Sequence, residues 1–367
     1  MSFYDELEQL DFDYWHRRVM QSTENDVADA FMHEQRTVED FAALLSPAAV
    51  PLLPEMIREA EKLTRKRFGQ TLGMYIPLYL TNLCSNSCKY CGFAAENKFR
   101  RKVLNREEVI AECEAIAAMG YETILVVTGE HQRKGGMDYF REMIPIVKQY
   151  STYLMMEVQP MDTEDYRELK GMGVDAVMVY QETYHKPTYK ENHVRGRKAD
   201  MRYRMETPER LGEAGMDKIG MGILLGLADF HADACMLAHH IAYMRRHYWQ
   251  SKISLSFPRL RPAAGGFIPP CPVSEKELIQ YICAFRMFDP ELEISISTRE
   301  SSKFRDAIVP IAINSISAGS STQPGGYAAD HHDLPQFIIN DDRSVTEISR
   351  HFEKMGLDLI WHSSRVS

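Results

Sequence analysis

Residues Met74–Gly92 read MYIPLYLTNLCSNSCKYCG, an apolar run that leads straight into a cysteine-rich loop. The run Met74–Leu80 is rich in aromatic and aliphatic side chains and has the length of a buried strand. The loop carries three cysteines with the spacing CxxxCxxC, namely Cys84, Cys88 and Cys91. This stretch therefore predicts a buried strand that ends in a metal-binding loop.

The strand is the first of a regular series along the chain. Further strands are expected at residues 123–128, 154–159, 176–180, 219–225, 253–257, 293–298 and 315–318. Helical patterns lie between them, at residues 105–119, 137–149, 163–172, 207–214, 232–248, 274–288 and 302–311. Eight strands that alternate with seven helices over about 250 residues predict an α/β fold of the (β/α)8 TIM-barrel type. A doubly wound open sheet is the alternative, although a cysteine loop stands where its glycine-rich dinucleotide turn would be.

Segments outside the barrel are expected at both ends of the chain. Residues 1–72 predict an N-terminal helical extension, with amphipathic helices at 24–31, 38–45 and 53–67. The barrel is expected to span residues 73–320. Residues 321–367 contain one helical pattern, at 345–355, and predict a C-terminal tail that packs on the barrel.

Composition argues against several classes of protein. The chain has 367 residues, of which 44% are hydrophobic and 26% charged, enough to bury a large core without disulfides. Its net charge of −9 argues against a nucleic-acid or membrane-surface partner, although residues 193–204 form a local basic patch. No apolar run reaches the ~18 residues that a membrane span needs, and no signal-peptide pattern opens the chain. A cytoplasmic protein is expected.

Three cysteines so close together point to metal in a reducing compartment. Three thiolates hold three corners of a four-iron cluster and leave one iron open to another ligand. A structural zinc site is the alternative, but it needs four ligands and the sequence offers no second cysteine pair. A ferredoxin-like electron carrier would also need a fourth cysteine. The remaining cysteines are scattered and are interpreted as small core residues: Cys113, Cys235, Cys271 and Cys283.

Polar residues and glycines follow the other expected strands, at the barrel edge where catalytic groups of this fold lie. They include Gly129, Glu130, Glu157, Glu182, Gly222, Gly226, Arg259, Arg261 and Arg299. Glu157 lies in an otherwise apolar strand, where an ionised carboxylate is costly unless it is paired. The expected partners are Arg259, Arg261 and Arg299. Arginine also suits a substrate carboxylate, because its planar fork binds both oxygens.

The cysteine loop resembles the signature of the radical S-adenosylmethionine superfamily, CxxxCx-aromatic-C, with Tyr90 as the aromatic residue. The resemblance implies a [4Fe–4S] cluster on the three cysteines, with S-adenosylmethionine on the open iron. It also implies one-electron cleavage of that cofactor to methionine and a 5′-deoxyadenosyl radical. The segment around Gly129 and Glu130 is similar to the part of the family that meets the methionine amino group. Gly222 and Gly226 belong to a segment that resembles, with some departures, the adenine-contact motif of the family.

Longer segments are similar to one subfamily, the aromatic amino-acid lyases, and above all to the tyrosine lyases of thiamine biosynthesis. They are YIPLYLTNLC (75–84), VTGEH (127–131), MEVQP (156–160), VYQETYH (179–185), SFPRLRP (256–262) and STRE (297–300). This resemblance covers nearly the whole chain. It implies cleavage of the Cα–Cβ bond of L-tyrosine to 2-iminoacetate (dehydroglycine) and p-cresol.

The same resemblance implies roles for individual residues. Tyr90, Glu157 and Arg299 are the expected catalytic residues, with Arg299 on the tyrosine carboxylate. Glu182 and Arg204 are expected to contact the aminocarboxylate or ribose of S-adenosylmethionine. The group that recognises the tyrosine hydroxyl stays open among four candidates: His131, Gln159, Tyr180 and Tyr184.

Three alternatives bear on the activity. The hydrogenase-maturation tyrosine lyases carry further cysteines near the C-terminus for a second cluster, and here no cysteine follows Cys283. A tryptophan lyase is the second alternative: its substrate differs by an indole, and the sequence alone does not define the volume of the pocket. A non-enzymatic metal-binding module is the alternative from a different class. The expected partners are thiazole synthase, which would receive the water-sensitive product, and an electron donor such as flavodoxin or ferredoxin.

Overall fold

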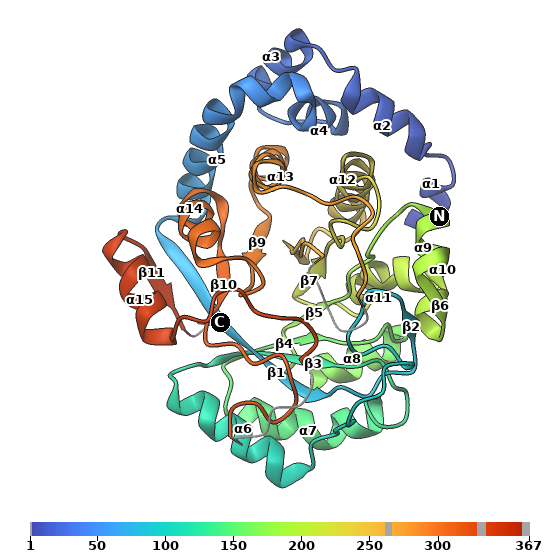
Figure 1. Ribbon diagram of the computed structural model, residues 1–367, viewed down its shortest axis with the longest axis vertical. Coiled ribbons are helices and arrows are strands. Elements are labelled where there is room, and N and C mark those ends of the chain that lie inside the picture. The colour runs from blue at the N-terminus through green and yellow to red at the C-terminus, as the bar shows by residue number, and fades with distance from the viewer. Residues whose placement is uncertain (1, 261–265, 329–334, 362–367) are drawn as a thin grey trace.

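The computed structural model describes residues 2–260, 266–328 and 335–361, and in it eight parallel strands close into a barrel (Figure 1). In order around the barrel they are β1 (Thr71–Thr81), β3 (Thr123–Thr128), β4 (Tyr153–Glu157), β5 (Ala176–Met178), β7 (Lys218–Met221), β8 (Lys252–Leu255), β9 (Glu293–Ile296) and β10 (Ser315–Ser317). β10 pairs with β1 and so closes the ring, with Met74 opposite Ile316. The predicted (β/α)8 barrel is confirmed, and the open doubly wound sheet is excluded.

Seven helices return the chain from one strand toward the next, as the periodic pattern predicted. They are α6 (Arg106–Ala118), α7 (Met137–Gln149), α8 (Thr163–Gly171), α11 (Thr207–Glu213), α12 (Phe230–His247), α13 (Glu275–Phe288) and α14 (Ser302–Ala312). Local sequence sets where several of them begin. The side chains of Asn105 and Ser274 each accept a hydrogen bond from the backbone N–H of a glutamate three positions on. The glutamate side chain in turn accepts a hydrogen bond from the backbone N–H of Asn105 or Ser274.

Side chains alternate along β1 and thereby separate the cavity from the outer core. Tyr75 and Tyr79 point into the barrel, where they line a cavity. Ile76 and Leu78 point outward into the apolar layer between the strands and the surrounding helices. This period of two is the geometry of any β-strand, and it places every second residue of a barrel strand on the inside.

The N-terminal helices form an arc outside the barrel (Figure 1). They are α1 (Phe3–Leu7), α2 (Phe12–Met20), α3 (Glu24–Met32), α4 (Val38–Leu45), the 3-10 helix η1 (Pro47–Leu52) and α5 (Leu53–Phe68). The arc packs on α12 and α13, where the Gln280 amide donates to the carbonyl oxygens of Leu44 and Ser46, at 2.9 and 3.0 Å. α1 and α2 were not predicted; α1 is short, but α2 is as long as α3, which was predicted.

The excursion between β5 and α11 contains short elements that the sequence pattern did not reveal. They are α9 (Lys186–Asn192), β6 (His193–Arg195), the 3-10 helix η2 (Arg197–Ala199) and α10 (Met201–Met205). β6 pairs antiparallel with β2 (Ser87–Cys88), which lies in the cysteine loop. The excursion therefore brings the basic patch of residues 193–204 against the cysteines.

The C-terminal segment adds one more strand to the sheet. After α15 (Val345–Lys354), β11 (Asp358–Ile360) runs parallel to the first residues of β1, outside the closed ring. β11 was not predicted, although it is no shorter than β5 and β10. Part of the predicted tail, residues 329–334 and 362–367, lies outside the described residues.

No single helix in the described part of the chain has both the length and the apolar character required to cross a membrane. Val38–Leu45 and Pro47–Phe68 meet those two criteria only when taken together, as a pair bent by 75°.

Candidate functional site

A cavity of about 200 Å³ opens at the carboxyl ends of the barrel strands. The three cysteines lie on its wall together with most of the other predicted site residues: Tyr90, Gly129, Glu130, Glu157, Glu182, Arg204 and Arg299. These residues come from loops that follow β1, β3, β4, β5 and β9 and from the excursion before α11. The barrel therefore brings into one cavity side chains as far apart in the sequence as Cys84 and Arg299, as the strand-end argument predicted.

All three cysteines of the loop are free thiols that face this cavity. Burial raises the pKa of each thiol, and that of Cys91 reaches about 11. Thiols in such surroundings stay protonated at neutral pH unless a positively charged partner displaces the proton. The loop therefore suits a metal centre rather than a reactive free thiolate.

The number of thiols bears on whether the loop holds a cluster or a single zinc ion, because a structural zinc ion takes four ligands. Sulfur ligands of one zinc ion lie roughly 4 Å apart, because each Zn–S bond is about 2.3 Å long. Within the described ranges, no three Cys, His, Asp or Glu side chains are placed so that they could share one ion. Three thiols that line one cavity can hold three irons of a four-iron cluster, which leaves one iron for another ligand. The residues present fit the [4Fe–4S] cluster and not the zinc alternative.

The aromatic residue of the motif, Tyr90, is turned toward the basic excursion. Its hydroxyl lies 2.8 Å from Nε2 of His193, and the edge of its ring meets Phe267. His193 in turn lies 2.7 Å from the carbonyl oxygen of Tyr189 through Nδ1. Burial lowers the pKa of His193 to about 3, so the ring is neutral. Tyr90 thus joins the cysteine loop to α9 and β6.

A buried network of charges stands beside the cysteines. Arg204 Nη1 lies 2.9 Å from Glu130 Oε1, and its Nη2 lies 3.5 Å from Glu182 Oε1. The same Glu182 oxygen lies 2.6 Å from Nζ of Lys198. Asn86, from the cysteine loop, donates to Glu130 Oε2 at 2.7 Å. Two carboxylates and two cations at the cavity wall are suited to a ligand that itself carries an ammonium group, a carboxylate and hydroxyl groups.

Lys198 is the charged residue of this network that sequence reasoning missed. Burial and the neighbouring Arg204 act to lower its pKa, but Glu182, Cys88 and Glu130 raise it overall, so the side chain is charged. Its only signal in the sequence was membership of the basic patch, whose other cations include the exposed Arg195. Pattern alone does not distinguish a buried cation from a solvated one.

Glu182 has a left-handed backbone, with φ at 72°, which is unfavourable for a residue other than glycine. The turn after it is held by the buried carboxylate of Asp233, on α12. Asp233 Oδ1 accepts a 2.7 Å hydrogen bond from the backbone N–H of Tyr184. Burial raises the pKa of Asp233 to about 7, and a hydrogen bond from Thr183 acts against this rise. The strained turn is therefore stabilised by a specific hydrogen bond to α12.

The predicted glycines have two kinds of surroundings. A Cβ on Gly129 would lie 2.4 Å from the carbonyl oxygen of Leu83, so only glycine lets this loop meet the cysteine loop. Gly222 and Gly226, both within the described ranges, do not line the cavity. A Cβ on Gly222 would lie 1.9 Å from the carbonyl oxygen of Ser256, and Gly226 has φ of +108°. These two glycines permit close packing behind the wall.

Arg299 and Glu157 also line the cavity. Burial lowers the pKa of Arg299, although the guanidinium remains charged, and its Nε has no hydrogen-bond partner among the described residues. Burial, with Glu182 adding to it, raises the pKa of Glu157 to about 7. The cavity thus has a cation and a carboxyl group that are both available to a ligand.

The expected pairing of Glu157 with Arg259 is wrong. Arg259 forms a two-pronged ion pair with Glu300, in which Nε lies 2.9 Å from Oε1. Arg261 lies outside the described residues, and no ion pair to Glu157 is present within them. The physical reason is that a buried carboxyl group avoids the cost of an unpaired charge by holding its proton, as the raised pKa shows.

Among the four candidates for the tyrosine hydroxyl, Tyr180 lines the cavity. The hydroxyl of Tyr184 instead lies 2.8 Å from Nδ1 of His240, in the contact between α12 and the N-terminal arc. His131 and Gln159, which the structure also describes, are not on the cavity wall. Wall residues that were not foreseen include Tyr79, whose hydroxyl donates to Gln336 Oε1 at 2.6 Å, and Gln336 itself.

Comparison with known proteins agrees with this geometry. The model of the radical SAM superfamily matches residues 78–237, and that of the Biotin and Thiamin Synthesis associated domain matches residues 256–358. The chain is 49% identical over 361 residues to the 2-iminoacetate synthases of Salmonella typhimurium and Escherichia coli, covering 98% of this chain and 96% of each relative.

Solved structures show the same arrangement. A crystal structure of HydG, a maturase of the [FeFe]-hydrogenase, matches with a TM-score of 0.89 and 31% identity, over 98% of this chain and 80% of that one. A methylornithine synthase shares the fold, with a TM-score of 0.72 and 20% identity over 91% of this chain and 97% of that one. On its identity to curated relatives over nearly its whole length, the chain belongs to the 2-iminoacetate synthase family of radical S-adenosylmethionine enzymes.

Proposed function

We propose that this chain is a tyrosine lyase that cleaves the Cα–Cβ bond of L-tyrosine to 2-iminoacetate and p-cresol, for the thiazole ring of thiamine. The observation that carries the proposal is the polarity of its cavity. Three thiols and a charged network line it together with an available cation and an available carboxyl group, Arg299 and Glu157. Identity of 49% to 2-iminoacetate synthases over nearly the whole chain supports the same reaction.

Cys84, Cys88 and Cys91 hold the [4Fe–4S] cluster in this proposal. When bound, the cluster supplies the electron that splits S-adenosylmethionine into methionine and a 5′-deoxyadenosyl radical, which starts the reaction on tyrosine. The loop places this chemistry inside the barrel, where Tyr90 and the excursion before α11 keep water away from the cysteines.

The charged network at the mouth binds S-adenosylmethionine. Gly129 brings backbone close to the cysteine loop, and Glu130 and Glu182 offer carboxylates to the ammonium and ribose hydroxyl groups. Arg204 and Lys198 offset the charge of these carboxylates and bind the carboxylate of the cofactor. Gly222 and Gly226 shape the wall behind the adenine.

Arg299 binds the tyrosine carboxylate, and Glu157 takes up the proton that the bound substrate releases. A carboxyl group with a pKa of about 7 both accepts and returns a proton near neutral pH, as a general base or acid requires. Tyr180 is our candidate for meeting the tyrosine hydroxyl, which is supported by its being the one of the four that lines the cavity.

An anaerobic assay tests the proposal. The protein is reconstituted with iron and sulfide, reduced with dithionite and given S-adenosylmethionine with L-tyrosine or L-tryptophan. We expect 5′-deoxyadenosine with p-cresol from tyrosine, and no 3-methylindole from tryptophan. 5′-Deoxyadenosine without p-cresol would reject the substrate but keep the radical chemistry. Replacement of the loop cysteines by serine should remove iron and activity, whereas the scattered and buried Cys113 provides the matched control.

We further propose two protein partners. 2-Iminoacetate is an imine that water hydrolyses, so an enzyme that consumes it, thiazole synthase, gains by receiving it directly. Reduction of the cluster needs a one-electron donor such as flavodoxin or ferredoxin. The first partner is tested by co-elution of thiazole synthase with this chain and by a higher thiazole yield when both are present. The second is tested by asking whether flavodoxin supports turnover in place of dithionite.

A further inference from the structure

The C-terminal segment Pro335–Arg343, here called the strap, crosses the barrel mouth beside Arg299. Two hydrogen bonds attach its start to the loop after β10, from Gln336 N to the Thr322 carbonyl and from Thr322 Oγ1 to the Phe337 carbonyl, both 3.0 Å long. Its far part is attached to the loop after β9. Asn340 donates from its backbone to Thr298 at 2.8 Å. The strap is thus a wall of the cavity.

Within the strap, Phe337 lies against the guanidinium of Arg299. The Cζ atom of Arg299 stands 3.7 Å from the centre of the Phe337 ring, and both residues line the cavity. Asn340 Nδ2 donates to the backbone carbonyl of Arg299 at 2.8 Å, so the strap holds the main chain and the side chain of the same residue. A ring stacked on one face leaves the N–H groups at the edge of the guanidinium pointing into the cavity.

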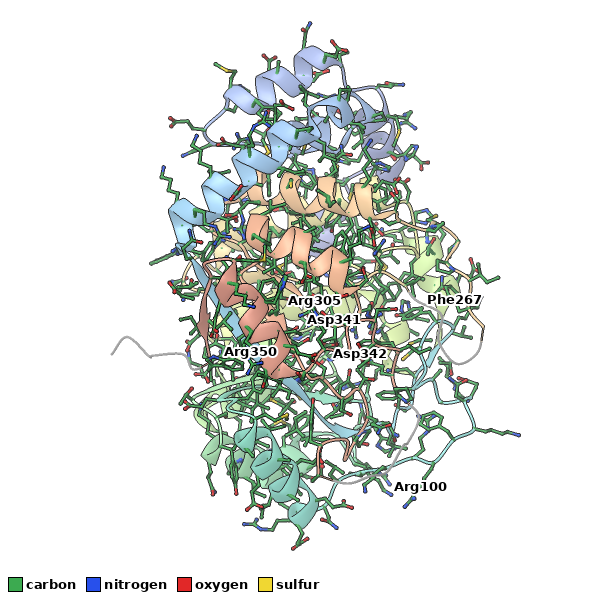
Figure 2. The ribbon with its side chains drawn as sticks, turned by 60° about the vertical axis from the view of Figure 1, so that its left-hand side comes forward. Arg100, Phe267, Arg305, Asp341, Asp342 and Arg350 are labelled. Atoms are coloured by element: carbon green, nitrogen blue, oxygen red, sulfur yellow. The ribbon has the colours of Figure 1, made fainter. Side chains whose placement is uncertain are left out.

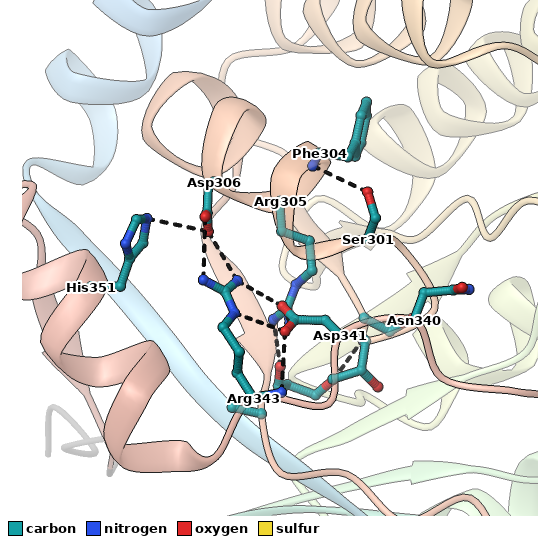
Figure 3. Close-up of polar contacts among 12 residues, drawn as sticks. Ser301, Phe304, Arg305, Asp306, Asn340, Asp341, Arg343 and His351 are labelled. Atoms are coloured by element: carbon teal, nitrogen blue, oxygen red, sulfur yellow. Dashed lines mark hydrogen bonds and ion pairs between the residues drawn. The ribbon is translucent and has the colours of Figure 1, made fainter.

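The strap itself is fixed by a buried ion-pair network (Figure 3). Arg305 Nη1 lies 2.5 Å from Asp341 Oδ2, and neither side chain has any exposed surface. Arg343 reaches the same carboxylate at 2.8 Å and pairs with Asp306 on α14. Figure 2 shows Arg305 and Asp341 together inside the molecule, whereas Arg100 points out into solvent. A strap pinned in this way presents Phe337 to Arg299 in one position.

We propose that Phe337 is a positioning residue, which holds the Arg299 guanidinium flat so that its edge receives the carboxylate of the amino-acid substrate. The proposal rests on the proposed function, in which Arg299 binds that carboxylate. A two-pronged arginine–carboxylate pair requires the guanidinium plane to be fixed, because a side chain with free rotamers loses entropy each time it binds. Arg299 has no ion-pair partner in the described structure to hold its side chain. The ring of Phe337 restricts the guanidinium before the substrate binds, and so reduces the entropy that is lost on binding.

The test compares Phe337→Leu, Phe337→Tyr and, as a matched control, Phe288→Leu in the reconstituted enzyme. Phe288 is also partly buried but packs against Phe41, in the contact between α13 and the N-terminal arc. Tyrosine and S-adenosylmethionine binding are titrated anaerobically without reductant, so that no turnover occurs. We expect Phe337→Leu to weaken tyrosine binding about tenfold and cofactor binding less than about twofold. Phe337→Tyr, which keeps the ring, and Phe288→Leu should bind tyrosine as the parent protein does.

A double-mutant cycle with Arg299→Lys adds a readout that a general structural role would not move. Lysine has no plane to stack, so Phe337→Leu should add little on top of Arg299→Lys. The proposal would be overturned if Phe337→Leu left tyrosine binding unchanged, or if it weakened tyrosine and cofactor binding equally. It would also be overturned if the effects of the two substitutions were independent. The parent protein reports separately on the proposed function, since a parent that binds no tyrosine and makes no p-cresol rejects that function whatever the variants do.

Discussion

Arg204 and Glu130 form an ion pair at the barrel mouth, with 2.9 Å between Nη1 and Oε1, although 74 positions separate them in the sequence. Both side chains are largely buried, and a second hydrogen bond joins Arg204 Nε to the carbonyl oxygen of Tyr180 at 2.7 Å. Arg204 therefore holds together the loops after β3 and β5, on either side of the proposed cofactor site.

Arg204→Lys should weaken S-adenosylmethionine binding at least about tenfold, because a lysine ammonium cannot reach all three acceptors. A hydrogen bond to a charged group is worth about 1.5–3 kcal/mol, which corresponds to this factor or more. Anaerobic calorimetry on the reconstituted enzyme measures the change. Arg202→Lys is the matched control, since Arg202 lies on the same short helix but is exposed and pairs with Glu206. Equal affinities in the two variants would contradict the prediction.

Asp233→Ala should also weaken cofactor binding, through the strained turn at Glu182. Without its acceptor on α12, the N–H of Tyr184 is buried and unsatisfied, and Glu182 can relax from its left-handed conformation. We expect a loss of about tenfold in affinity for S-adenosylmethionine, and a smaller loss in Asp233→Asn, which retains an acceptor oxygen. Asp217→Ala, at an exposed ion pair with Lys170, controls for the loss of a carboxylate. An unchanged affinity in Asp233→Ala would show that the turn needs no such support.

Glu157→Gln should flatten the dependence of stability on pH. The pKa of Glu157 is raised by burial, and then by Glu182, from 4.5 to about 7. Between these values the folded protein binds a proton that the unfolded chain has released, so this group lowers the stability as pH rises through the window. The melting temperature should therefore fall less between about pH 5 and pH 8 in the variant than in the parent protein. The exposed Glu164→Gln should behave as the parent does, and parallel profiles for all three proteins would contradict the prediction.

Asp341→Asn should destabilise the protein by about 3–5 kcal/mol, because it leaves the fully buried Arg305 without its anionic partner. Denaturant unfolding of the reconstituted protein measures this loss. Asp342→Asn is the matched control, since Asp342 is the exposed neighbour of Asp341 in the same strap. A loss below about 1 kcal/mol in Asp341→Asn would mean that water or a rearranged Arg343 replaces the carboxylate, and that the strap is not pinned as described.

The sequence by itself determined the barrel and the metal loop. Alternating apolar runs and helical periods are local properties, and the eight strands were predicted within a few residues of their observed bounds. The cysteine spacing is equally local, because three ligands within eight residues must lie together in any fold. The strand-end argument also located Glu130, Glu157 and Arg299, since the carboxyl ends of parallel strands meet at one edge.

Only the tertiary structure decided which charges pair and which stay available. Arg259 was expected beside Glu157 but pairs with Glu300. Lys198 turned out to be buried against Glu182, and Phe337 to lie on Arg299. The short strands β6 and β11 were not predicted either. The physical reason is that an ion pair or a stacked ring depends on distances of a few ångströms between segments far apart in the chain, and these distances exist only once the barrel has closed.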